Sequence, residues 1–455
     1  MSASTNSKLR PPAAADPAAD FSYRYERIGA DPVSAPPLLA ISGGPDSMAL
    51  AVSFSNWWQQ RYRGARLHAA IVDHGLRAEA SREAETVAAW LDQLGLAARV
   101  LRITSPKPQS GHQAWARHQR YYLLAEAALN LSPEAMIVTA HHAGDQAETV
   151  AMRLHHHSGL HGLRGFGRDS FHYGMRVTRP LHDIAPAELH RVLDAAGTSF
   201  IEDPSNADRR FERVRIRQML AGAGDKLTRQ HHRLAAAAAS LHDHLSTALA
   251  HRIAGCWGAE EGRAWIDAGC FAALPDAAQS LLLEGFVRAV GTTPLPTRGA
   301  ARQRLARTLS GGAEATLGGC EWRHHHGNII CFREAENPPA DVRLAAGQWG
   351  IYGQNWHVFA PVAGKFTAIG ARRFAELKRQ SPEIWAQKQA PARAFWTMPV
   401  FIPDKSGEDM RLPALEDGSI IPKLYDKDKP ETIAPVTRFA GRQHLDWMTL
   451  RNERH

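Results

Sequence analysis

With 455 residues, the chain is too long for one ordinary hydrophobic core, and about two to four domains are expected. Its 54 Lys and Arg residues outnumber its 46 Asp and Glu residues. The resulting formal charge of +8 favours a polyanionic partner such as a nucleic acid. The sequence contains no apolar run of about 18 residues and no apolar segment typical of a secretory signal, so neither a membrane span nor secretion is predicted.

Residues 1–35 are rich in Ala, Pro and Ser and predict a flexible N-terminal tail, in which 21–28 favour a short helix packed on the first domain. From residue 36 onward, apolar strands and helices alternate. Strands are predicted at 37–40, 67–72, 98–103 and 136–140, and helices at 46–58, 81–94, 113–129 and 145–155. Four strand–helix repeats indicate the α/β class with a doubly wound parallel sheet, in a domain spanning residues 36–225.

The first strand is joined to the first helix by a glycine-containing loop. The loop and its flanks are Ile41, Ser42, Gly43, Gly44, Pro45, Asp46 and Ser47. Backbone N–H groups and a helix N-terminus directed at one point bind anions, so this loop is a candidate phosphate site. Asp46 fits such a site if it holds a metal ion that bridges to the phosphates. The alternative is an ordinary strand-to-helix turn in which Asp46 caps the helix.

Polar clusters follow three of the predicted strands, at 42–47, 73–77 and 141–145. In a doubly wound sheet, ligands bind beyond the carboxyl ends of the strands, so these clusters are expected to share one site. Asp73 and Arg77 are candidate nucleotide contacts. A P-loop of the G-x-x-x-x-G-K-[ST] form is absent from the sequence, which disfavours a Walker-type NTPase.

Two carboxylates, Asp145 and Glu148, lie three residues apart at a predicted helix start and therefore share a face. They are suited to hold a cationic substrate or to accept its proton, whereas the alternative is compensation of the helix dipole. His141 or His142 could shuttle the proton or orient a base, and His141 is preferred. Arg117 and Arg120 share another helix face, either to bind an anion or as solvated side chains.

A basic segment at 209–217 follows the turn expected at 202–206. In a helix, Arg210, Arg213 and Arg217 would share one face and repel each other unless an acidic partner lay there. Contact with a nucleic-acid backbone is favoured over a solvated face. A helix at 186–195 precedes this segment.

A helix at 230–253, helices within 271–309 and strands around Glu321 and Ile329 predict a small α/β domain over 226–335. After a linker at Pro338 and Pro339, short apolar segments at 356–359, 399–402 and 419–421 and a helix at 371–378 predict a mostly β module over 336–455. The four cysteines are Cys256, Cys270, Cys320 and Cys331. They lack C-x-x-C spacing and are expected to be reduced, as in a cytoplasmic protein.

Several motifs occur together in the first half of the chain. Residues 42–47 match every fixed position of S-G-G-x-D-S, which resembles the signature of the PP-loop ATP pyrophosphatases. Further matches are V-D-H-G-L-R at 72–77, A-R-x-x-R-Y at 116–121, A-H-H-x-x-D-Q-A-E-T at 140–149, S-G-L-x-G-L at 158–163, R-P-L at 179–181 and D-P-S-N at 203–206. This set resembles the tRNA(Ile)-lysidine synthetase family, over about residues 38–220 and more weakly beyond.

The resemblance implies that ATP adenylates the C2 oxygen of the wobble cytidine in the CAU anticodon of tRNA(Ile), and that free L-lysine then displaces AMP. The catalytic residues implied are Asp46, Arg117, His141 and Asp145. ATP binding is assigned to Ile41, Ser42, Gly43, Gly44, Pro45, Asp46, Ser47, Asp73 and Arg77. Lysine binding is assigned to Asp145 and Glu148, tRNA binding to Arg120, Arg209, Arg210, Arg213, Arg215 and Arg217, and Mg²⁺ binding to Asp46.

The chain departs from the family pattern at Gly144, where the family often has a second acidic residue. Two alternatives stay open. One is a PP-loop enzyme that thiolates tRNA, which the absence of cysteine before Cys256 disfavours. The other is a non-catalytic RNA-binding protein with a decayed nucleotide site. By analogy with the family, a homodimer is an alternative to a monomer.

Overall fold

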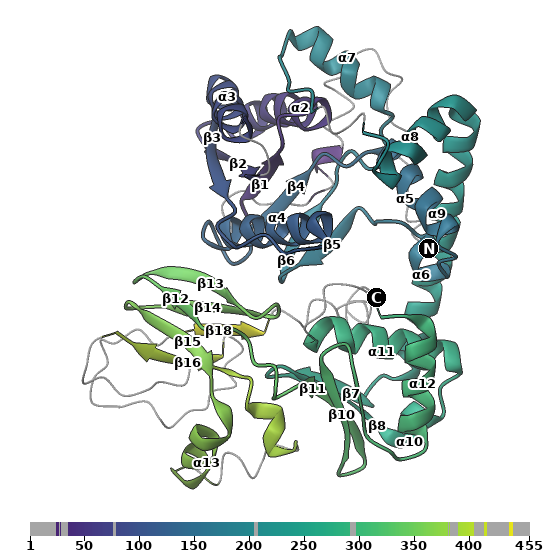
Figure 1. The fold of residues 1–455 in the computed structure, drawn as a ribbon, viewed down its shortest axis with the longest axis vertical. Coiled ribbons are helices and arrows are strands. Elements are labelled where there is room, and N and C mark those ends of the chain that lie inside the picture. Colours follow the sequence, from purple (N-terminus) through teal and green to yellow (C-terminus); the bar gives the residue numbers. More distant parts are fainter. Residues whose placement is uncertain are drawn as a thin grey trace, which may run out of the picture. The chain divides into compact units, whose positions relative to one another are not determined.

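The computed structural model describes residues 24–26, 28, 35–75, 79–203, 208–291, 297–380, 382, 390–404, 414–415 and 436–439. The chain divides into two compact units, one comprising Met1–Ser170 and Arg176–Ser240 and the other Phe171–Met175 and Leu241–His455. Each unit is described by itself below, with the elements labelled in Figure 1.

A six-stranded sheet, most of which belongs to the first unit, has the strand order β3-β2-β1-β4-β6-β5. Its strands are β1 (Pro37–Ile41), β2 (Leu67–Asp73), β3 (Leu96–Arg102), β4 (Met136–Thr139), β5 (Asp169–His172) and β6 (Met175–Thr178). β1 runs parallel to β2 and β4, β2 runs parallel to β3, and β4 runs parallel to β6. All residues of β1 and β4 are buried, as expected of strands covered on both faces.

Helices cover both faces of this sheet. They are α2 (Pro45–Arg61), α3 (Ala80–Gln93), α4 (His112–Leu129), α5 (Ala143–His155), α6 (Leu160–Leu163), α7 (Pro186–Ala196) and α8 (Glu212–Ala223). Leu39 and Ile41 of β1 belong to a core that also contains residues of α2, α3 and α7. Figure 1 shows α2 and α3 on one side of the sheet and α4 on the other. The predicted doubly wound parallel sheet is therefore confirmed.

The strand order reverses between β1 and β4, because β2 and β3 lie on one side of β1 while β4 and β6 lie on the other. The chain leaves these two central strands at the same edge, and the loops that follow them diverge there to opposite sides. Such a switch point forms a crevice that receives ligands. The topology therefore places the loop 42–44 and the segment that begins at His141 beside one crevice.

The described part of the N-terminal region packs on the first unit. Residues 24–26 are helical, in agreement with the short helix expected there. Tyr25 is 1% exposed, its ring lies 4.5 Å from that of Phe54, and its hydroxyl is 2.9 Å from Ser53 Oγ. Burial of an aromatic ring contributes about 2–3 kcal/mol, so these residues form part of the core.

Helix α9 (Asp225–Arg252) contains the boundary between the two units. In the second unit, β7 (Trp257–Glu260), β8 (Arg263–Asp267), β9 (Ala315–Leu317), β10 (Cys320–His325) and β11 (Asn328–Arg333) form a sheet in the order β7-β8-β11-β10-β9. It packs with α10 (Ala268–Ala272), α11 (Asp276–Val290) and α12 (Gly299–Ser310) around a second core. The helices and strands expected between 230 and 333 are thus present.

The later part of the second unit contains two further sheets, in the orders β12-β15-β16 and β13-β14-β18-β17. Their strands are β12 (Val342–Leu344), β13 (Gln348–Tyr352), β14 (Trp356–Ala360), β15 (Gly364–Ala368), β16 (Pro399–Pro403), β17 (Ala414–Leu415) and β18 (Val436–Phe439). Helix α13 (Gly370–Gln380) matches the helix expected at 371–378, whereas the segment expected at 419–421 lies outside the described residues. Among the described helices, none is long and apolar enough to cross a membrane.

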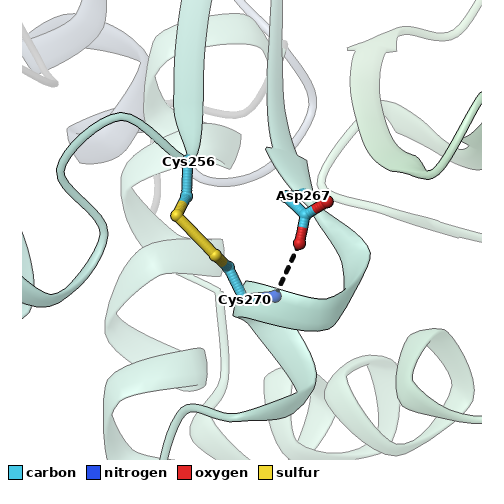
Figure 2. The surroundings of a disulfide bond; sticks show 3 residues. All are labelled: Cys256, Asp267 and Cys270. Atoms are coloured by element: carbon cyan, nitrogen blue, oxygen red, sulfur yellow. Dashed lines mark hydrogen bonds between the residues drawn. A yellow bond between two sulfur atoms is a disulfide. The ribbon is translucent and has the colours of Figure 1, made fainter.

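The expectation that all four cysteines are reduced is wrong for two of them. Cys256 and Cys270 form a disulfide with their Cα atoms 6.5 Å apart, as Figure 2 shows. Cys256 directly precedes β7, and Cys270 lies in α10 directly after β8. Antiparallel pairing of β7 with β8 therefore brings together two residues 14 apart in sequence. Asp267 caps α10 by accepting a hydrogen bond from the backbone N–H of Cys270 (2.8 Å).

Candidate active site

The loop after β1 is held in shape by two serines. Ser47 Oγ accepts from the backbone N–H of Ser42 (3.2 Å), lies 3.2 Å from Ser42 Oγ, and donates to the carbonyl of Gly44 (2.9 Å). Gly43 has φ +85°, and its carbonyl accepts from the backbone N–H of Ile201 (2.8 Å). These contacts fix a tight turn at the N-terminus of α2, the geometry expected of an anion-binding loop.

Gly43→Ala is expected to destabilise the first unit by about 2–4 kcal/mol, because it combines a left-handed backbone with a steric clash. A Cβ on Gly43 would lie 2.5 Å from Val87 Cγ2. Gly64→Ala is the matched control, since Gly64 has φ +84° but a Cβ added there would meet nothing within 4 Å. Urea unfolding should show the larger loss for Gly43→Ala, and equal losses would contradict the clash.

Asp46 occupies the first turn of α2, but its carboxylate does not cap that helix. The N-cap is Gly44, and α2 has no side-chain cap among the described residues. Instead, Asp46 Oδ2 lies 3.4 Å from His142 Nε2. Burial opposes ionisation of Asp46, but the hydrogen bond and charge of His142, together with His190 and Arg217, lower its pKa below the usual value. Asp46 is therefore an ionised carboxylate whose side chain is 38% exposed at the crevice.

His142 connects the loop after β1 with the start of α5. Its ring Nδ1 accepts from the backbone N–H groups of Gly144 (3.0 Å) and Asp145 (3.3 Å). In return, the backbone N–H of His142 donates to Asp145 Oδ2 (3.1 Å). This reciprocal capping leaves Nε2 to carry the proton of the neutral ring, and Nε2 faces Asp46 and Asp145 (3.6 Å). Burial lowers the pKa of His142, but Asp46, Asp145 and Glu148 outweigh it and raise the pKa overall.

The acidic pair is enclosed by arginines of α8. Arg213 binds both carboxylates, with Nη2 2.5 Å from Asp145 Oδ1 and Nε 2.6 Å from Glu148 Oε2. Arg217 Nε lies 2.6 Å from Glu148 Oε1. The Glu148 side chain is 5% exposed and that of Asp145 is 13% exposed, and Asp145 also caps the start of α5, so the helix-terminus role and the ion pairs are both present. The two carboxylates form a cation site that the chain itself fills.

The basic segment separates into two groups. Arg213 and Arg217 turn toward the acidic pair, whereas Arg215 Nη1 donates to the carbonyls of Arg209 and Arg210 (both 2.9 Å). The prediction that Arg210 shares a helix face with Arg213 and Arg217 is wrong, because α8 begins at Glu212. The acidic partner expected to relieve their repulsion is, for Arg213 and Arg217, the acidic pair of α5.

A second group of cations lies on α4 and at the end of β6. The guanidinium carbon of Arg117 lies 5.1 Å from the ring centroid of Tyr121. Burial and the charge of Arg117 lower the pKa of Arg120, and the same two effects lower that of Arg179, which is 2% exposed. Although burial opposes it, these three arginines lower the pKa of Tyr121. Their mutual repulsion is the condition under which an anion binds favourably. Sequence reasoning noted the R-P-L motif but assigned no role to Arg179.

His141, which follows β4, lies between the two groups of arginines. It is partly buried, and desolvation together with the charges of Arg179, Arg120, Arg117 and Arg213 holds its pKa well below the usual value. Its Nδ1 is 2.9 Å from Thr139 Oγ1. His141 is therefore neutral at physiological pH, and His142, ranked below it on sequence grounds, is the histidine that contacts the carboxylates.

The low pKa of His141 gives a testable pH dependence. A histidine kept neutral in the fold stabilises it above the unfolded pKa near 6.5, and this contribution is lost as pH falls below that value. Wild-type protein should therefore lose about 1 kcal/mol more than His141→Asn between pH 6.5 and 5.5. Urea unfolding at both pH values measures this difference, with the exposed His112→Asn as control. Equal losses in wild type and His141→Asn would contradict it.

Asp73 is the last residue of β2, and Arg77 comes four residues later. Asp73 Oδ1 accepts from the backbone N–H of Gly75 (2.9 Å) and Oδ2 accepts from Ser81 Oγ (2.6 Å), so this carboxylate also orders the turn toward α3. Arg77 lies outside the described residues. The nucleotide contacts of both residues stay predictions.

Gly144 is packed closely. A Cβ at this position would lie 2.9 Å from His142 Cε1 and 3.0 Å from Pro186 Cγ at the start of α7. A larger residue therefore requires the ring of His142 or of Pro186 to move. The family often has an acidic residue at this position. The space that such a side chain would need is filled here by His142 and Pro186.

Comparison with known proteins shows the family to which the chain belongs. Residues 17–223 match the model of the PP-loop domain. A Rhodopseudomonas palustris protein named tRNA(Ile)-lysidine synthase is 45% identical over 195 residues, which cover 43% of this chain and 56% of that protein. The match thus spans little more than half the length of that relative.

Two further relatives of the same name are matched over more of their length. The Bradyrhizobium sp. (strain BTAi1) protein is 40% identical over 287 residues, covering 60% of this chain and 80% of that protein. The Rhizobium meliloti protein is 37% identical over 385 residues, covering 79% of this chain and 76% of that protein. With its PP-loop domain, its site at the sheet edge and this coverage, the chain belongs to the tRNA(Ile)-lysidine synthase family.

Proposed function

We propose that this protein uses ATP to join free L-lysine to C2 of the wobble cytidine in the CAU anticodon of tRNA(Ile), releasing pyrophosphate and AMP. The observation that carries the proposal is His142 Nε2, which lies 3.4 Å from Asp46 on the PP-loop side and 3.6 Å from Asp145 of the acidic pair. The candidate phosphate loop and the acidic pair therefore adjoin. Adenylation followed by attack of an amine needs both.

In the first step, the C2 oxygen of cytidine attacks the α-phosphate and pyrophosphate leaves. The loop 42–47 binds the phosphates through backbone N–H groups at the start of α2. Arg117, with Arg120 and Arg179 nearby, stabilises the charge that develops on the α-phosphate.

Asp46 fits a magnesium ion, because Mg²⁺ is commonly held by one or two carboxylates together with substrate phosphates. Its carboxylate is ionised, and its side chain is 38% exposed beside the phosphate loop. Bound there, the ion would neutralise charge on the phosphates. Asp46 would hold it, and His142 orients that carboxylate.

In the second step, the ε-amino group of lysine attacks C2 and AMP departs. Lysine has an ordinary pKa of about 10.4, so producing the neutral amine near pH 7 costs roughly 4–5 kcal/mol. Asp145 and Glu148 bind the ammonium and accept its proton. The ammonium takes a place that Arg213 and Arg217 fill in the free protein, so binding of lysine requires at least one guanidinium to turn away.

The released guanidinium groups become available to an anion. Arg209, Arg210 and Arg215 lie beside them at the start of α8. We infer that these five arginines, with Arg120, contact the tRNA backbone, and that lysine and tRNA thereby favour the same rearrangement. From the proposed tRNA substrate we infer a cytoplasmic location. Sedimentation would distinguish a monomer from a homodimer.

The direct test is to incubate the protein with ATP, lysine and unmodified tRNA(Ile) bearing a CAU anticodon, and then to weigh the anticodon nucleosides. A lysine-sized gain on cytidine is expected, with AMP and pyrophosphate formed in equal amounts. A sulfur-sized gain in a parallel incubation with a sulfide donor in place of lysine would support the thiolase alternative, although the described cysteines are either paired, as Cys256 and Cys270 are, or buried in the second core, as Cys320 and Cys331 are. No change in the tRNA would overturn the proposal.

A further inference from the structure

Residues 164–168 connect α6 to β5 and pass close to His141. Two side chains hold this segment, and the reaction proposed above does not explain why they do so. Gln146 of α5 binds the first part and Arg179, after β6, binds the second. Phe166 lies between these two attachments.

Gln146 uses its whole amide on this segment. Its Nε2 donates to the carbonyls of Arg164 (3.1 Å) and Phe166 (3.2 Å), and its Oε1 accepts from the backbone N–H of Phe166 (3.0 Å). Gly165 has φ +64°, and a Cβ there would lie 2.3 Å from Gln146 Oε1. The close approach therefore requires glycine. Gln146 is 6% exposed and adjoins Asp145 in sequence. The residue that holds the segment therefore belongs to the same helical turn as the acidic pair.

Arg179 holds the other side. Its backbone N–H donates to the carbonyl of Arg168 (2.8 Å), and its Nη1 donates to the carbonyl of Gly167 (3.0 Å). Its guanidinium carbon lies 5.4 Å from the centroid of the Phe166 ring, within the range of a cation–π contact. Arg179 is therefore both an anchor for the backbone and a support for the ring.

The ring of Phe166 also contacts the candidate active site. Its centroid lies 5.4 Å from that of His141, with the two planes inclined at 58°. Phe166 remains partly exposed. Arg179 supports one side of the ring, and Phe166 with the neutral His141 supplies an uncharged flat surface near the sheet edge.

A flat uncharged surface is suited to one component of the reaction. Triphosphate and lysine are charged, whereas a nucleobase offers a π face that stacks on aromatic side chains. Two bases enter the proposed reaction, adenine and the target cytosine. Phe166 lies on the β4–β6 side of the switch point, next to Asp145 through Gln146, and C2 of the reacting base must reach the amine held there.

On the basis of the proposed function, we propose that Phe166 forms the wall against which the target pyrimidine stacks, and that Gln146 and Arg179 are positioning residues that fix this wall. The acceptor base is thereby oriented between the phosphate loop and the acidic pair.

The test is initial-rate kinetics with ATP, lysine and tRNA(Ile) varied in turn. Phe166→Leu, which keeps an apolar side chain but removes the ring, should lower kcat/KM for tRNA by about 10- to 100-fold and leave the KM for ATP within about twofold. Phe166→Tyr should restore most of the activity. Gln146→Glu, which loses both donated hydrogen bonds, should act like Phe166→Leu. Gln279→Glu is the control, because Gln279 is equally buried and donates to the carbonyl of Phe271 in the second unit.

An unchanged kcat/KM for tRNA in Phe166→Leu, with active wild-type protein, would overturn this inference and leave the proposed function intact. A rise in the KM for ATP instead of an effect on tRNA would assign the wall to adenine and also overturn it. Inactive wild-type protein would refute the proposed function itself. If Gln146→Glu and Gln279→Glu lowered kcat/KM for tRNA equally and lowered Tm equally, Gln146 would have only a structural role, and its assignment as a positioning residue would be wrong.

Discussion

Asp46→Asn is expected to lower the rate of pyrophosphate release at least about 1,000-fold, the largest effect predicted for a single substitution in this chain. Asparagine keeps an oxygen that can accept from His142 Nε2, 3.4 Å away in the wild type, so the local structure should persist. What it removes is the negative charge that would hold Mg²⁺ against the phosphates. Release of labelled pyrophosphate from ATP in the presence of tRNA measures the effect.

Asp92→Asn is the control, because Asp92 is exposed and lies near the C-terminal end of α3, the helix that follows β2. It should retain wild-type activity. The affinity of the Asp46→Asn protein for tRNA, measured by retention of the complex on a filter, should also be unchanged. Pyrophosphate release above about one tenth of the wild-type rate would remove Asp46 from the metal site.

Asp145→Asn is expected to lower kcat/KM for lysine at least about 100-fold while sparing adenylation. The substitution retains an oxygen that can cap α5 by accepting from the backbone N–H of His142, so it separates charge from helix capping. Without the second carboxylate, Glu148 is left to bind the ammonium and is still contested by Arg213 and Arg217. Rapid quenching should reveal adenylated tRNA that accumulates instead of turning over.

The control for this experiment is Asp169→Asn, which removes a carboxylate paired with an arginine, Arg176 (3.0 Å), away from the acidic pair. Its lysine kinetics should match those of the wild type. If Asp145→Asn blocked pyrophosphate release as strongly as lysine transfer, the assignment of Asp145 to the second step would fail.

Local patterns were sufficient to predict strands β1 to β4 of the first sheet and the helices that follow them, whereas β5, β6 and α6 were not predicted. An all-apolar strand such as β1 is distinctive because both faces of a parallel sheet are covered, and the polar loops after β1, β2 and β4 could be placed at one edge from strand direction alone. The motifs resembling the family then assigned roles to particular residues. Helix bounds differed by a few residues at most, as at α5, which begins at Ala143 rather than at Asp145.

Long-range pairing was out of reach of such patterns. Arg213 and Arg217 are separated from Glu148 by 65 and 69 residues, and spacing within the basic segment shows only that its members repel one another. The sequence therefore could not show that carboxylates of the same chain pair with these arginines, and an RNA partner was predicted instead. The disulfide between Cys256 and Cys270 depends in the same way on a strand pairing that sequence spacing does not reveal.

The choice between His141 and His142 could not be made from residue type. The two are adjacent and identical, and their environments differ only because the chain turns from β4 into α5 between them. That turn directs His142 toward carboxylates, which raise its pKa against the effect of burial, and leaves His141 where desolvation and nearby arginines lower its pKa.

The tight fit around Gly144 has an evolutionary consequence. With Pro186 Cγ 3.0 Å and His142 Cε1 2.9 Å from the site of a Cβ, a mutation that introduced a carboxylate at 144 would meet a fitness cost through displacement of the imidazole that joins the two halves of the crevice. A smaller residue at 186 relieves one of these two contacts and leaves only the imidazole to adjust. An acidic residue at 144 is therefore expected to be tolerated better in family members with a smaller residue at 186, so that the two positions, which lie on different helices, covary.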